Sequence, residues 1–469
     1  MRGSAAVNDS PSTPPRRPAD LWRAGPVLSS SDRPLARYVA RPLREFLRVE
    51  SAGSVLLLLA AAAALVWANS PWSESYGDFW HTHLSLEVGS FHLDGSLQHW
   101  VNDALMVIFF FVVGLEIKYE LVSGDLRDPR TAALPIVAAV GGMVAPALLY
   151  VAVAGGGDAG AGWGIPMATD IAFAVGVLGV LGRRIPSSAR LFLLTLAIVD
   201  DIGAIVVIAV FYTADLDLVW LAAALGLLLV IVGMRLLRIW LIPAYVVVGV
   251  GVWYALFESG VHATLAGVAL GLLTPASALL KPDVARDYAQ HALADRELDP
   301  DEVHRLQFLV AESVPVVERL QHHLHPLSAY LVLPVFALAN AGVDLGGAVF
   351  ANATTTAVGL GIAAGLVIGK PVGILLACVI AVRTGVARLP ARTSWGQIAG
   401  VGAVAGIGFT VSLFIAGLSF PDSPALTEAA KVGTLGASVV AALVGVVVLL
   451  LASGPDATDQ ADSNRSESA

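Results

Sequence analysis

Two adjacent aspartates, Asp200 and Asp201, lie in the middle of an apolar run that extends from about residue 187 to residue 212. An ionisable side chain at this depth in a membrane costs about 2.5–3.5 kcal/mol on insertion scales, so it normally faces the bundle interior and marks a pathway. Carboxylate oxygens suit a hard cation such as Na⁺ or Li⁺, and protons compete for the same oxygens. We therefore interpret the pair as an ion-binding and proton-carrying site. The alternative is two protonated acids that are hydrogen-bonded inside the bundle.

Lys370 is the only charged residue within the apolar run from about 355 to 382, in a chain whose basic residues are mostly arginine. Arginine stays protonated in proteins, whereas a buried lysine can lose its proton. A lysine that is paired with an acid is the simplest interpretation, with Asp200 or Asp201 as the partner. Chance retention of a lysine is the alternative.

Two further apolar runs, 163–182 and 394–418, are interrupted by small and hydroxyl residues at comparable depth. The first contains Thr169 and Asp170, and the second contains the sequence Gly-Ile-Gly-Phe-Thr. This pattern is expected of discontinuous helices whose ends form an ion site, although small residues can equally indicate close helix packing. Asp170 can neutralise the positive ends of such half-helices and Lys370 the negative ends.

Charged and titratable residues also gather where two apolar runs end. Glu116 and Glu120 are four residues apart, so they share a helix face, and they form either a cation-attracting funnel or an ordinary helix-end cluster with Lys118. His322 and His325 are either pH sensors, since histidine titrates near neutral pH, or solvated loop residues.

The composition is that of a polytopic membrane protein. Of 469 residues, 56% are hydrophobic and only 14% are charged, whereas soluble domains carry about 25% charged residues. A net charge of −9 argues against a nucleic-acid partner. The single cysteine, Cys378, excludes an intrachain disulfide and a cysteine-rich zinc site. No G-x-x-x-x-G-K-[ST] motif is present, so we expect no nucleotide and no cofactor beyond the transported ions.

Apolar runs of membrane-spanning length predict an all-α fold of about twelve transmembrane helices that sits in the lipid bilayer. Lysine and arginine concentrate in every second connection and in the N-terminal segment. The positive-inside rule then places both termini in the cytoplasm, which requires an even number of spans. The predicted spans are 52–70, 97–121, 131–154, 163–182, 187–212, 217–234, 239–257, 260–275, 324–343, 355–382, 394–418 and 427–452.

Three segments follow from this division. Residues 1–48 and 454–469 are polar and read as disordered cytoplasmic tails, and 49–453 form the transmembrane domain. In residues 84–95, apolar and polar side chains alternate on either side of Gly89-Ser90, which predicts an outer β-hairpin with a two-residue turn. We expect this hairpin to pack either on a partner subunit or on the protein's own outer face. The long connection 276–322 predicts short cytoplasmic helices.

Five motifs together resemble the bacterial NhaA family of Na⁺/H⁺ antiporters over about residues 44–452. They are Ala168-Thr-Asp-Ile-Ala-Phe-Ala174, Leu196-Ala-Ile-Val-Asp-Asp-Ile-Gly-Ala204, Ser259-Gly-Val-His-Ala-Thr-Leu265, Gly369-Lys-Pro-Val-Gly-Ile374 and Gly406-Ile-Gly-Phe-Thr410. The family is one of the examples on which the rule of interrupted transporter helices rests, so the resemblance and the broken-helix interpretation are not independent.

The resemblance implies inverted repeats, with spans four and eleven discontinuous and crossing at the midplane. It implies that Asp200 and Asp201 bind the ion and carry protons, that Asp201 is nearest to sodium and that Asp200 bridges Lys370, with Thr169 and Asp170 at the crossing. It further implies electrogenic Na⁺ (or Li⁺)/H⁺ exchange across the bacterial inner membrane, which regulates internal pH and sodium. Activation at alkaline pH and homodimers joined through the outer hairpin are also implied.

Two positions depart from the family pattern. Gln321 stands where the family has a glutamate, and Tyr119 where it has an arginine, both in the region to which pH regulation is attributed. The pH of activation is therefore not implied. Rival functions are a cation channel, a non-transporting membrane sensor, and a symporter on a similar scaffold; the symporter would need a roomier and less acidic midplane.

Overall fold

The computed structural model describes residues 52–88, 91–213, 216–237, 239, 241–294, 299–346 and 356–453. The chain divides into two units, Met1–Ala52 and Gly53–Ala469, and the described helices and strands lie in the second, apart from Ala52 at the start of α3. The tails that the sequence predicts, 1–48 and 454–469, lie outside the described residues, as does the predicted turn at Gly89-Ser90.

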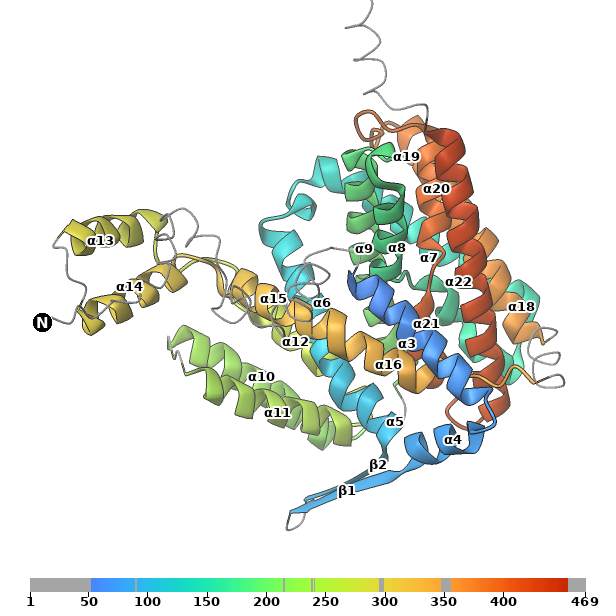
Figure 1. Cartoon of the computed structure of the whole chain (residues 1–469), viewed down its shortest axis with the longest axis horizontal. Coiled ribbons are helices and arrows are strands. Elements are labelled where there is room, and N and C mark those ends of the chain that lie inside the picture. Colours follow the sequence, from blue (N-terminus) through green and yellow to red (C-terminus); the bar gives the residue numbers. More distant parts are fainter. Residues whose placement is uncertain are drawn as a thin grey trace, which may run out of the picture. The chain divides into compact units, whose positions relative to one another are not determined.

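Helices make up nearly all of the regular structure (Figure 1). In chain order the elements are α3 (Ala52–Ala68), α4 (Ser73–His81), β1 (His83–Val88), β2 (Phe91–Ser96), α5 (Leu97–Trp100), η3 (Val101–Leu105), α6 (Met106–Val122), η4 (Asp125–Arg127), α7 (Pro129–Ala154), η5 (Gly157–Met167), α8 (Ile171–Leu181), η6 (Gly182–Arg184), α9 (Ser187–Phe211), α10 (Leu218–Leu236), α11 (Ile242–Glu258), α12 (Leu265–Leu273), α13 (Pro282–Ala294), α14 (Pro300–Glu312), α15 (Val316–Leu327), η7 (Ser328–Val332), α16 (Leu333–Asn340), α18 (Ala357–Ala364), η8 (Gly365–Gly369), α19 (Lys370–Arg383), α20 (Trp395–Ala405), α21 (Phe409–Ser419) and α22 (Pro424–Ala452).

Every apolar run that the sequence predicts to span a membrane contains helix. Among the described residues, five helical stretches are long and apolar enough to cross unaided, namely α7, α9, α10, α18 to α19, and α22. Three pairs reach that length only across a bend: α3 with α4 (113°), η5 with α8 (44°) and α20 with α21 (45°). The many-span helical architecture is confirmed, while the number twelve and the inverted repeats stay predictions.

Three details differ from, or refine, the sequence prediction. α4 is an additional helix that follows the bend after α3, which ends just before Pro71. The predicted span 260–275 is helical only over α12, because the chain forms turns before Leu265. β1 and β2 pair antiparallel with Val88 opposite Phe91, so the predicted hairpin is present.

Two pairs of helices approach each other so closely that only glycine fits. A Cβ on Gly373 of α19 would overlap the Gly141 carbonyl oxygen of α7, and a Cβ on Gly114 of α6 would lie 2.8 Å from the Val268 carbonyl oxygen of α12. Close backbone approach of this kind is how membrane helices associate without a hydrophobic driving force. It holds α6 and α7 in fixed positions beside α9, which carries the tandem aspartates.

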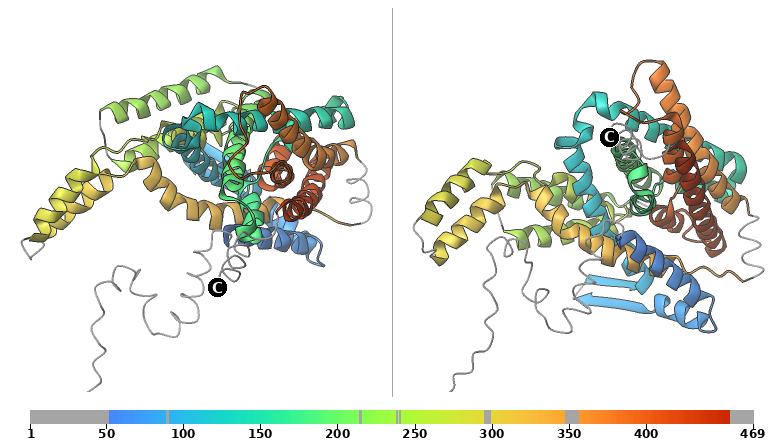
Figure 2. Two further views of the ribbon diagram at one scale, coloured as in Figure 1. Left: turned by 90° about the horizontal axis from the view of Figure 1, so that it is seen from above. Right: turned by 45° about the horizontal axis from the view of Figure 1, so that its top comes forward.

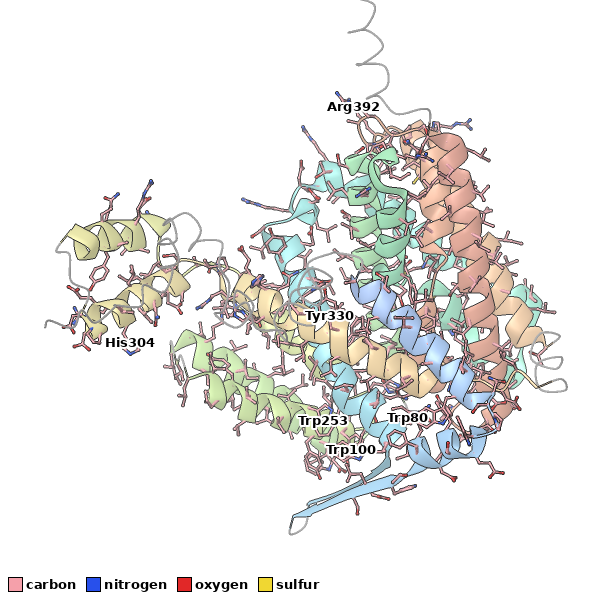
Figure 3. The ribbon with its side chains drawn as sticks, in the orientation of Figure 1. Trp80, Trp100, Trp253, His304, Tyr330 and Arg392 are labelled. Carbon is pink, nitrogen blue, oxygen red and sulfur yellow. The ribbon has the colours of Figure 1, made fainter. Side chains whose placement is uncertain are left out.

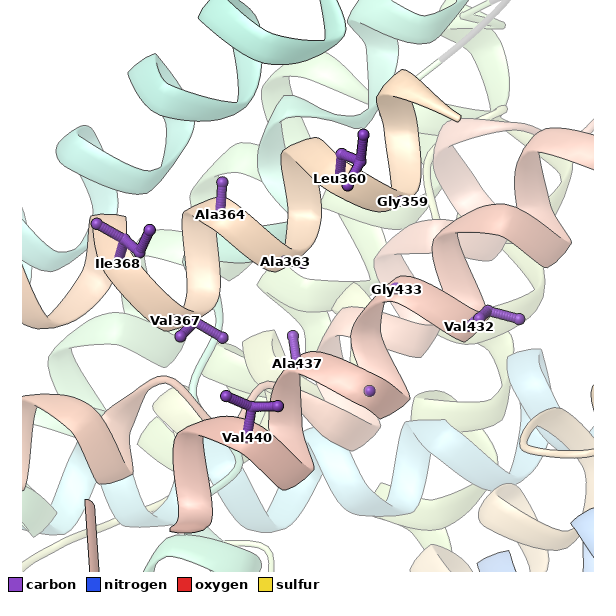
Figure 4. Close-up of a pocket in the computed structure, with 11 residues that line it drawn as sticks. Gly359, Leu360, Ala363, Ala364, Val367, Ile368, Val432, Gly433, Ala437 and Val440 are labelled. Atoms are coloured by element: carbon purple, nitrogen blue, oxygen red, sulfur yellow. The ribbon is translucent and has the colours of Figure 1, made fainter. Parts of the chain in front are cut away.

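The outward faces of the helices are apolar. On α22, Leu443 and Leu451 expose 63% and 82% of their surface. Between α18, η8 and α22 lies an apolar groove of about 450 Å³, lined by residues such as Leu360, Ile368 and Val440 (Figure 4). Large exposed apolar surfaces of this kind mark contact with lipid or another protein.

The two ends of the helices differ in the residues they carry. Trp80, Trp100 and Trp253 lie toward the end at which β1 and β2 are found, whereas Arg392 lies at the opposite end (Figure 3). Both views of Figure 2 show α13 and α14 projecting from the remaining helices. The 276–322 connection contains α13, α14 and the start of α15, and the short helices that the sequence predicts are therefore present.

Candidate ion-binding site

The first interrupted helix breaks between η5 and α8. η5 ends at Met167, the backbone of Ala168 is extended, and α8 starts at Ile171. Asp170 caps the new helix, because its Oδ1 accepts the N–H of Phe173 at 3.0 Å. Aspartate is among the strongest N-cap residues, so the residue that ends the extended segment also starts the second half-helix.

The second interrupted helix breaks between α20 and α21, at Gly406–Gly408. The two breaks are joined through their backbones: the N–H of Asp170 donates to the Ile407 carbonyl at 2.6 Å. The Thr169 hydroxyl donates to the Ala405 carbonyl at 3.0 Å. Polar backbone groups that a break leaves without helical partners therefore satisfy one another across the crossing.

One carboxylate serves the starts of two half-helices. Asp170 Oδ2 accepts the backbone N–H of Thr410 at 2.9 Å and its hydroxyl at 2.6 Å, while Oδ1 caps α8. The N-terminal ends of helices carry partial positive charge, so an anion between α8 and α21 is favourable. Asp170 is 2% exposed, and its charge is balanced by these dipoles and hydrogen bonds.

Lys370 occupies the opposite electrostatic position. Its ammonium donates to the Met167 carbonyl at the end of η5, where helix carbonyls carry partial negative charge. It also forms an ion pair with Asp200, with Nζ 3.0 Å from Oδ2. The same Oδ2 lies 2.7 Å from the Thr169 hydroxyl, whose single hydrogen is shared between this oxygen and the Ala405 carbonyl. Of the two acids considered from the sequence, Asp200 is thus the partner of the lysine.

Asp200 and Asp201 are both buried, with exposures of 0% and 4%. The Oδ1 atom of each has no hydrogen-bond donor within the described part of the chain. Asp201 is subject to the negative charges of Asp200, Glu116 and Asp170. Buried carboxylate oxygens without donors are high in free energy unless they take up a proton or a cation. The pair can therefore hold either one.

No cluster of three or more His, Cys, Asp or Glu side chains suited to a metal is found among the described residues. A cation at the tandem aspartates would accordingly take its remaining oxygens from hydroxyls such as that of Thr169, from backbone carbonyls or from water.

The acids of α6 behave differently from each other. Glu120 Oε2 accepts the N–H of Asp125 at 2.9 Å, which is a helix-end contact. Glu116 has the Gln321 side chain of α15 as a hydrogen-bond partner and acts electrostatically on Asp201. The local geometry therefore favours the helix-end interpretation for Glu120, and it links Glu116 to the buried pair.

The histidines are not brought to the crossing. His322 and His325 are exposed on α15. The ring of His322 packs edge-on against that of His323, with the ring centroids 5.7 Å apart. Within the described residues, none of their hydrogen bonds or ion pairs reaches Asp200 or Asp201.

The sequence did not identify three of the groups that complete the crossing. Thr410 supplies two hydrogen bonds to Asp170, and the carbonyls of Met167 and Ala405 accept bonds from Lys370 and Thr169. The hydroxyl of Thr410, two residues after Gly406-Ile-Gly408, was an available signal. Backbone carbonyls belong to every residue and give no sequence signal.

Fold and site together define a multi-pass membrane protein in which two interrupted helices cross beside buried charges, the arrangement by which secondary transporters build ion sites. The model of the Na⁺/H⁺ antiporter 1 family matches residues 44–449. The Na⁺/H⁺ antiporter NhaA 3 of Frankia alni is 51% identical over 414 residues, 88% of this chain and 89% of that protein. The Na⁺/H⁺ antiporter NhaA of Janthinobacterium sp. (strain Marseille) is 47% identical over 88% of this chain and 93% of that protein. The Na⁺/H⁺ antiporter NhaA of Anaeromyxobacter sp. (strain Fw109-5) is also 47% identical, over 94% of this chain and 94% of that protein. The chain belongs to the Na⁺/H⁺ antiporter 1 family.

Proposed function

We propose that this protein exchanges cytoplasmic Na⁺, or Li⁺, for external protons. The observation that carries the proposal is the buried pair Asp200 and Asp201 beside the crossing, each with one carboxylate oxygen that has no donor among the described residues. Family membership and the names of the relatives support the same exchange.

In this mechanism the two cargoes exclude each other. When the site faces the cytoplasm, Na⁺ displaces protons from Asp200 and Asp201; when it faces outward, protons displace Na⁺. The ion pair of Asp200 with Lys370 and the bond from Thr169 orient one carboxylate and leave Asp201 for the ion. The proton gradient drives the cycle without a nucleotide or another cofactor. More protons than sodium ions move in each cycle, so transport is electrogenic.

The proposed topology has twelve spans with inverted repeats, in the bacterial inner membrane, and with both termini in the cytoplasm. The placement of Arg392 at the end of the helices opposite to β1 and β2 supports this orientation. The two interrupted spans bend by nearly equal angles, 44° and 45°, which supports their being counterparts in the repeats.

We also propose a homodimer joined through residues 84–95. An isolated two-stranded hairpin is marginally stable in water, yet β1 and β2 are paired along six residues each. A partner subunit would supply the missing packing.

The candidates for regulation by pH are Glu116, Glu120, His322 and His325. Gln321 and Tyr119 would alter the pH at which transport begins.

Asp201→Asn tests the site. The amide cannot exchange a proton for sodium, so we expect sodium-driven proton movement in everted vesicles to disappear. Asp217→Asn is the matched control: Asp217 caps α10 through its Oδ1, and asparagine caps about as well as aspartate, so exchange should stay normal. Unchanged exchange by the Asp201 variant would refute the assignment. Current without coupled proton movement would indicate a channel.

A further inference from the structure

α22 carries a polar stripe that the proposed mechanism does not use. Thr427, Lys431, Thr434 and Ser438 follow one another at intervals of four, three and four residues, so they lie on one face of the helix. The helix is otherwise strongly apolar, with a mean hydropathy of 2.8 over its most apolar window. The groove between α18 and α22 is lined by other residues of this helix, including Val432 and Val440. The stripe is therefore distinct from the surface that borders the groove.

Two hydroxyls of the stripe are buried without partners. Thr434 is 0% exposed and Ser438 is 6% exposed, and neither hydroxyl has a hydrogen-bond partner in the described part of the chain. Other helical hydroxyls do bond the carbonyl one turn earlier: Thr195 bonds Leu191 and Ser419 bonds Ile415. Buried polar groups that lack protein partners commonly hydrate through ordered water.

The stripe leads to the crossing. One turn beyond Ser438, Ala441 lies on the same face and packs at the second break: a Cβ on Gly406 would be 3.2 Å from the Cβ of Ala441. The next residue after Gly406 is Ile407, whose carbonyl binds the backbone of Asp170. α22 contacts both halves of each interrupted helix, namely α20 and α21 as well as η5 and α8.

Lys431 lies at the other end of the unpartnered segment. It is half-buried, and its ammonium forms no hydrogen bond or ion pair with the described residues. In the proposed topology this is the outer side, where lysine and arginine are otherwise absent from the connections. The positive charge of Lys431 repels Na⁺ and an excess proton alike, and the Glu428 carboxylate, three residues earlier on the same helix, acts on it with the opposite sign.

We propose that Thr434 and Ser438 line a water-filled path along α22, by which protons reach the crossing from the outside. A hydroxyl both donates and accepts hydrogen bonds, so it can support a file of water in either orientation, as proton movement requires. This inference rests on the proposed exchange function and names the outer route to the same site.

Paired substitutions separate the hydroxyl from the shape of the side chain. Thr434→Val keeps the shape and removes the hydroxyl, and Thr434→Ser keeps the hydroxyl and removes the methyl group. In proteoliposomes, Thr434→Val and Ser438→Ala should each slow sodium-driven proton movement roughly fivefold, the rate change expected for one lost hydrogen bond. The apparent affinity for Na⁺ should not change. Thr434→Ser should transport normally, as should Thr274→Val, whose hydroxyl is already bonded to the Leu270 carbonyl. Normal rates with Thr434→Val and slow rates with Thr434→Ser would overturn the path and indicate packing.

A second measurement does not depend on transport. Cys378 is the only cysteine and is buried, so Cys378→Ala provides a background for Ser438→Cys and for the matched neighbour Val439→Cys, which is 61% exposed on the outward face. Thiols react as thiolates, which requires water. A small anionic methanethiosulfonate, which Lys431 does not repel, added from outside should modify residue 438 and leave residue 439 unmodified. If residue 438 does not react, the path is refuted, whereas the absence of exchange in the wild-type protein would refute only the proposed function.

Discussion

At the scale of single residues, Lys370 shows how the crossing keeps charge inside a membrane protein. Its ammonium is 0% exposed and is held between the Asp200 carboxylate and the Met167 carbonyl. A buried ion pair contributes little net stability compared with apolar residues of the same volume, but removal of one partner leaves the other charge uncompensated.

Lys370→Met should therefore destabilise the protein by about 3–5 kcal/mol, visible as a lower melting temperature in detergent. The double variant Lys370→Met/Asp200→Asn should recover much of that loss, because neither charge then remains unpaired. The four proteins form a double-mutant cycle that isolates the coupling between the two side chains. Simple additivity of the two single effects would contradict the ion pair as the source of the loss.

The residues taken alone predicted which side chains meet at the crossing, and the family resemblance added the pairing of Asp200 with Lys370. Asp200, Lys370, Asp170 and Thr169 were identified because charged and hydroxyl side chains are rare in apolar runs. Spacing along one helix does not determine whether Asp200 or Asp201 pairs with the lysine, because that depends on the rotation of α9 relative to α19. The resemblance implied Asp200, and the ion pair agrees with it. Thr410 was identified only as part of the interruption, because its bonds to Asp170 arise from the fold and not from the spacing of residues.

At the scale of elements, the breaks in the helices were predictable where the residue composition changes. They were not predictable where only the packing of the folded chain determines the bend. Glycine and hydroxyl residues indicated both breaks, and the observed bends of 44° and 45° follow them. The sharp bend between α3 and α4 was not predicted, since residues 73–81 are polar enough to read as a loop. These residues form α4 because tertiary contacts stabilise the helix: for example, the Tyr76 hydroxyl donates to the Leu338 carbonyl at 2.9 Å.

The close contact of α7 with α19 gives a prediction at this scale. Gly373→Ala places a Cβ against the Gly141 backbone, and overpacking of this kind costs about 1–3 kcal/mol. Because α19 carries Lys370 at its start, the shift should also lower the exchange rate. Gly226→Ala on α10 is the matched control, since no atom lies within 4 Å of a Cβ there; it should leave stability unchanged or raise it by up to about 1 kcal/mol through helix propensity. Thermal unfolding in detergent distinguishes the two, and equal melting temperatures for both variants would contradict the packing argument.

At the scale of the whole molecule, the multi-pass helical fold was predictable because hydropathy and the distribution of arginine report directly on the bilayer. The crossing could not be predicted from hydropathy and the distribution of arginine. Residues 167–170, 200–201, 370 and 405–410 come from four separate segments, and only the three-dimensional fold brings them together. The segments meet at one buried cluster of charges, so ion binding at that cluster should change the stability of the entire protein.

That coupling gives a test on the intact wild-type protein. A ligand that binds only the folded state stabilises it by about 2.7 kcal/mol at a hundredfold excess over its dissociation constant. If Na⁺ and protons compete for Asp200 and Asp201, added NaCl should raise the melting temperature at alkaline pH, where the carboxylates are free of protons. The increase should disappear as the pH falls, because protons then occupy the same oxygens. Choline chloride at equal ionic strength controls for screening, and Asp201→Asn should abolish the sodium effect at every pH. An equal rise with Na⁺ at acidic and alkaline pH would show that sodium binds without displacing protons, and exchange at this site would then be impossible.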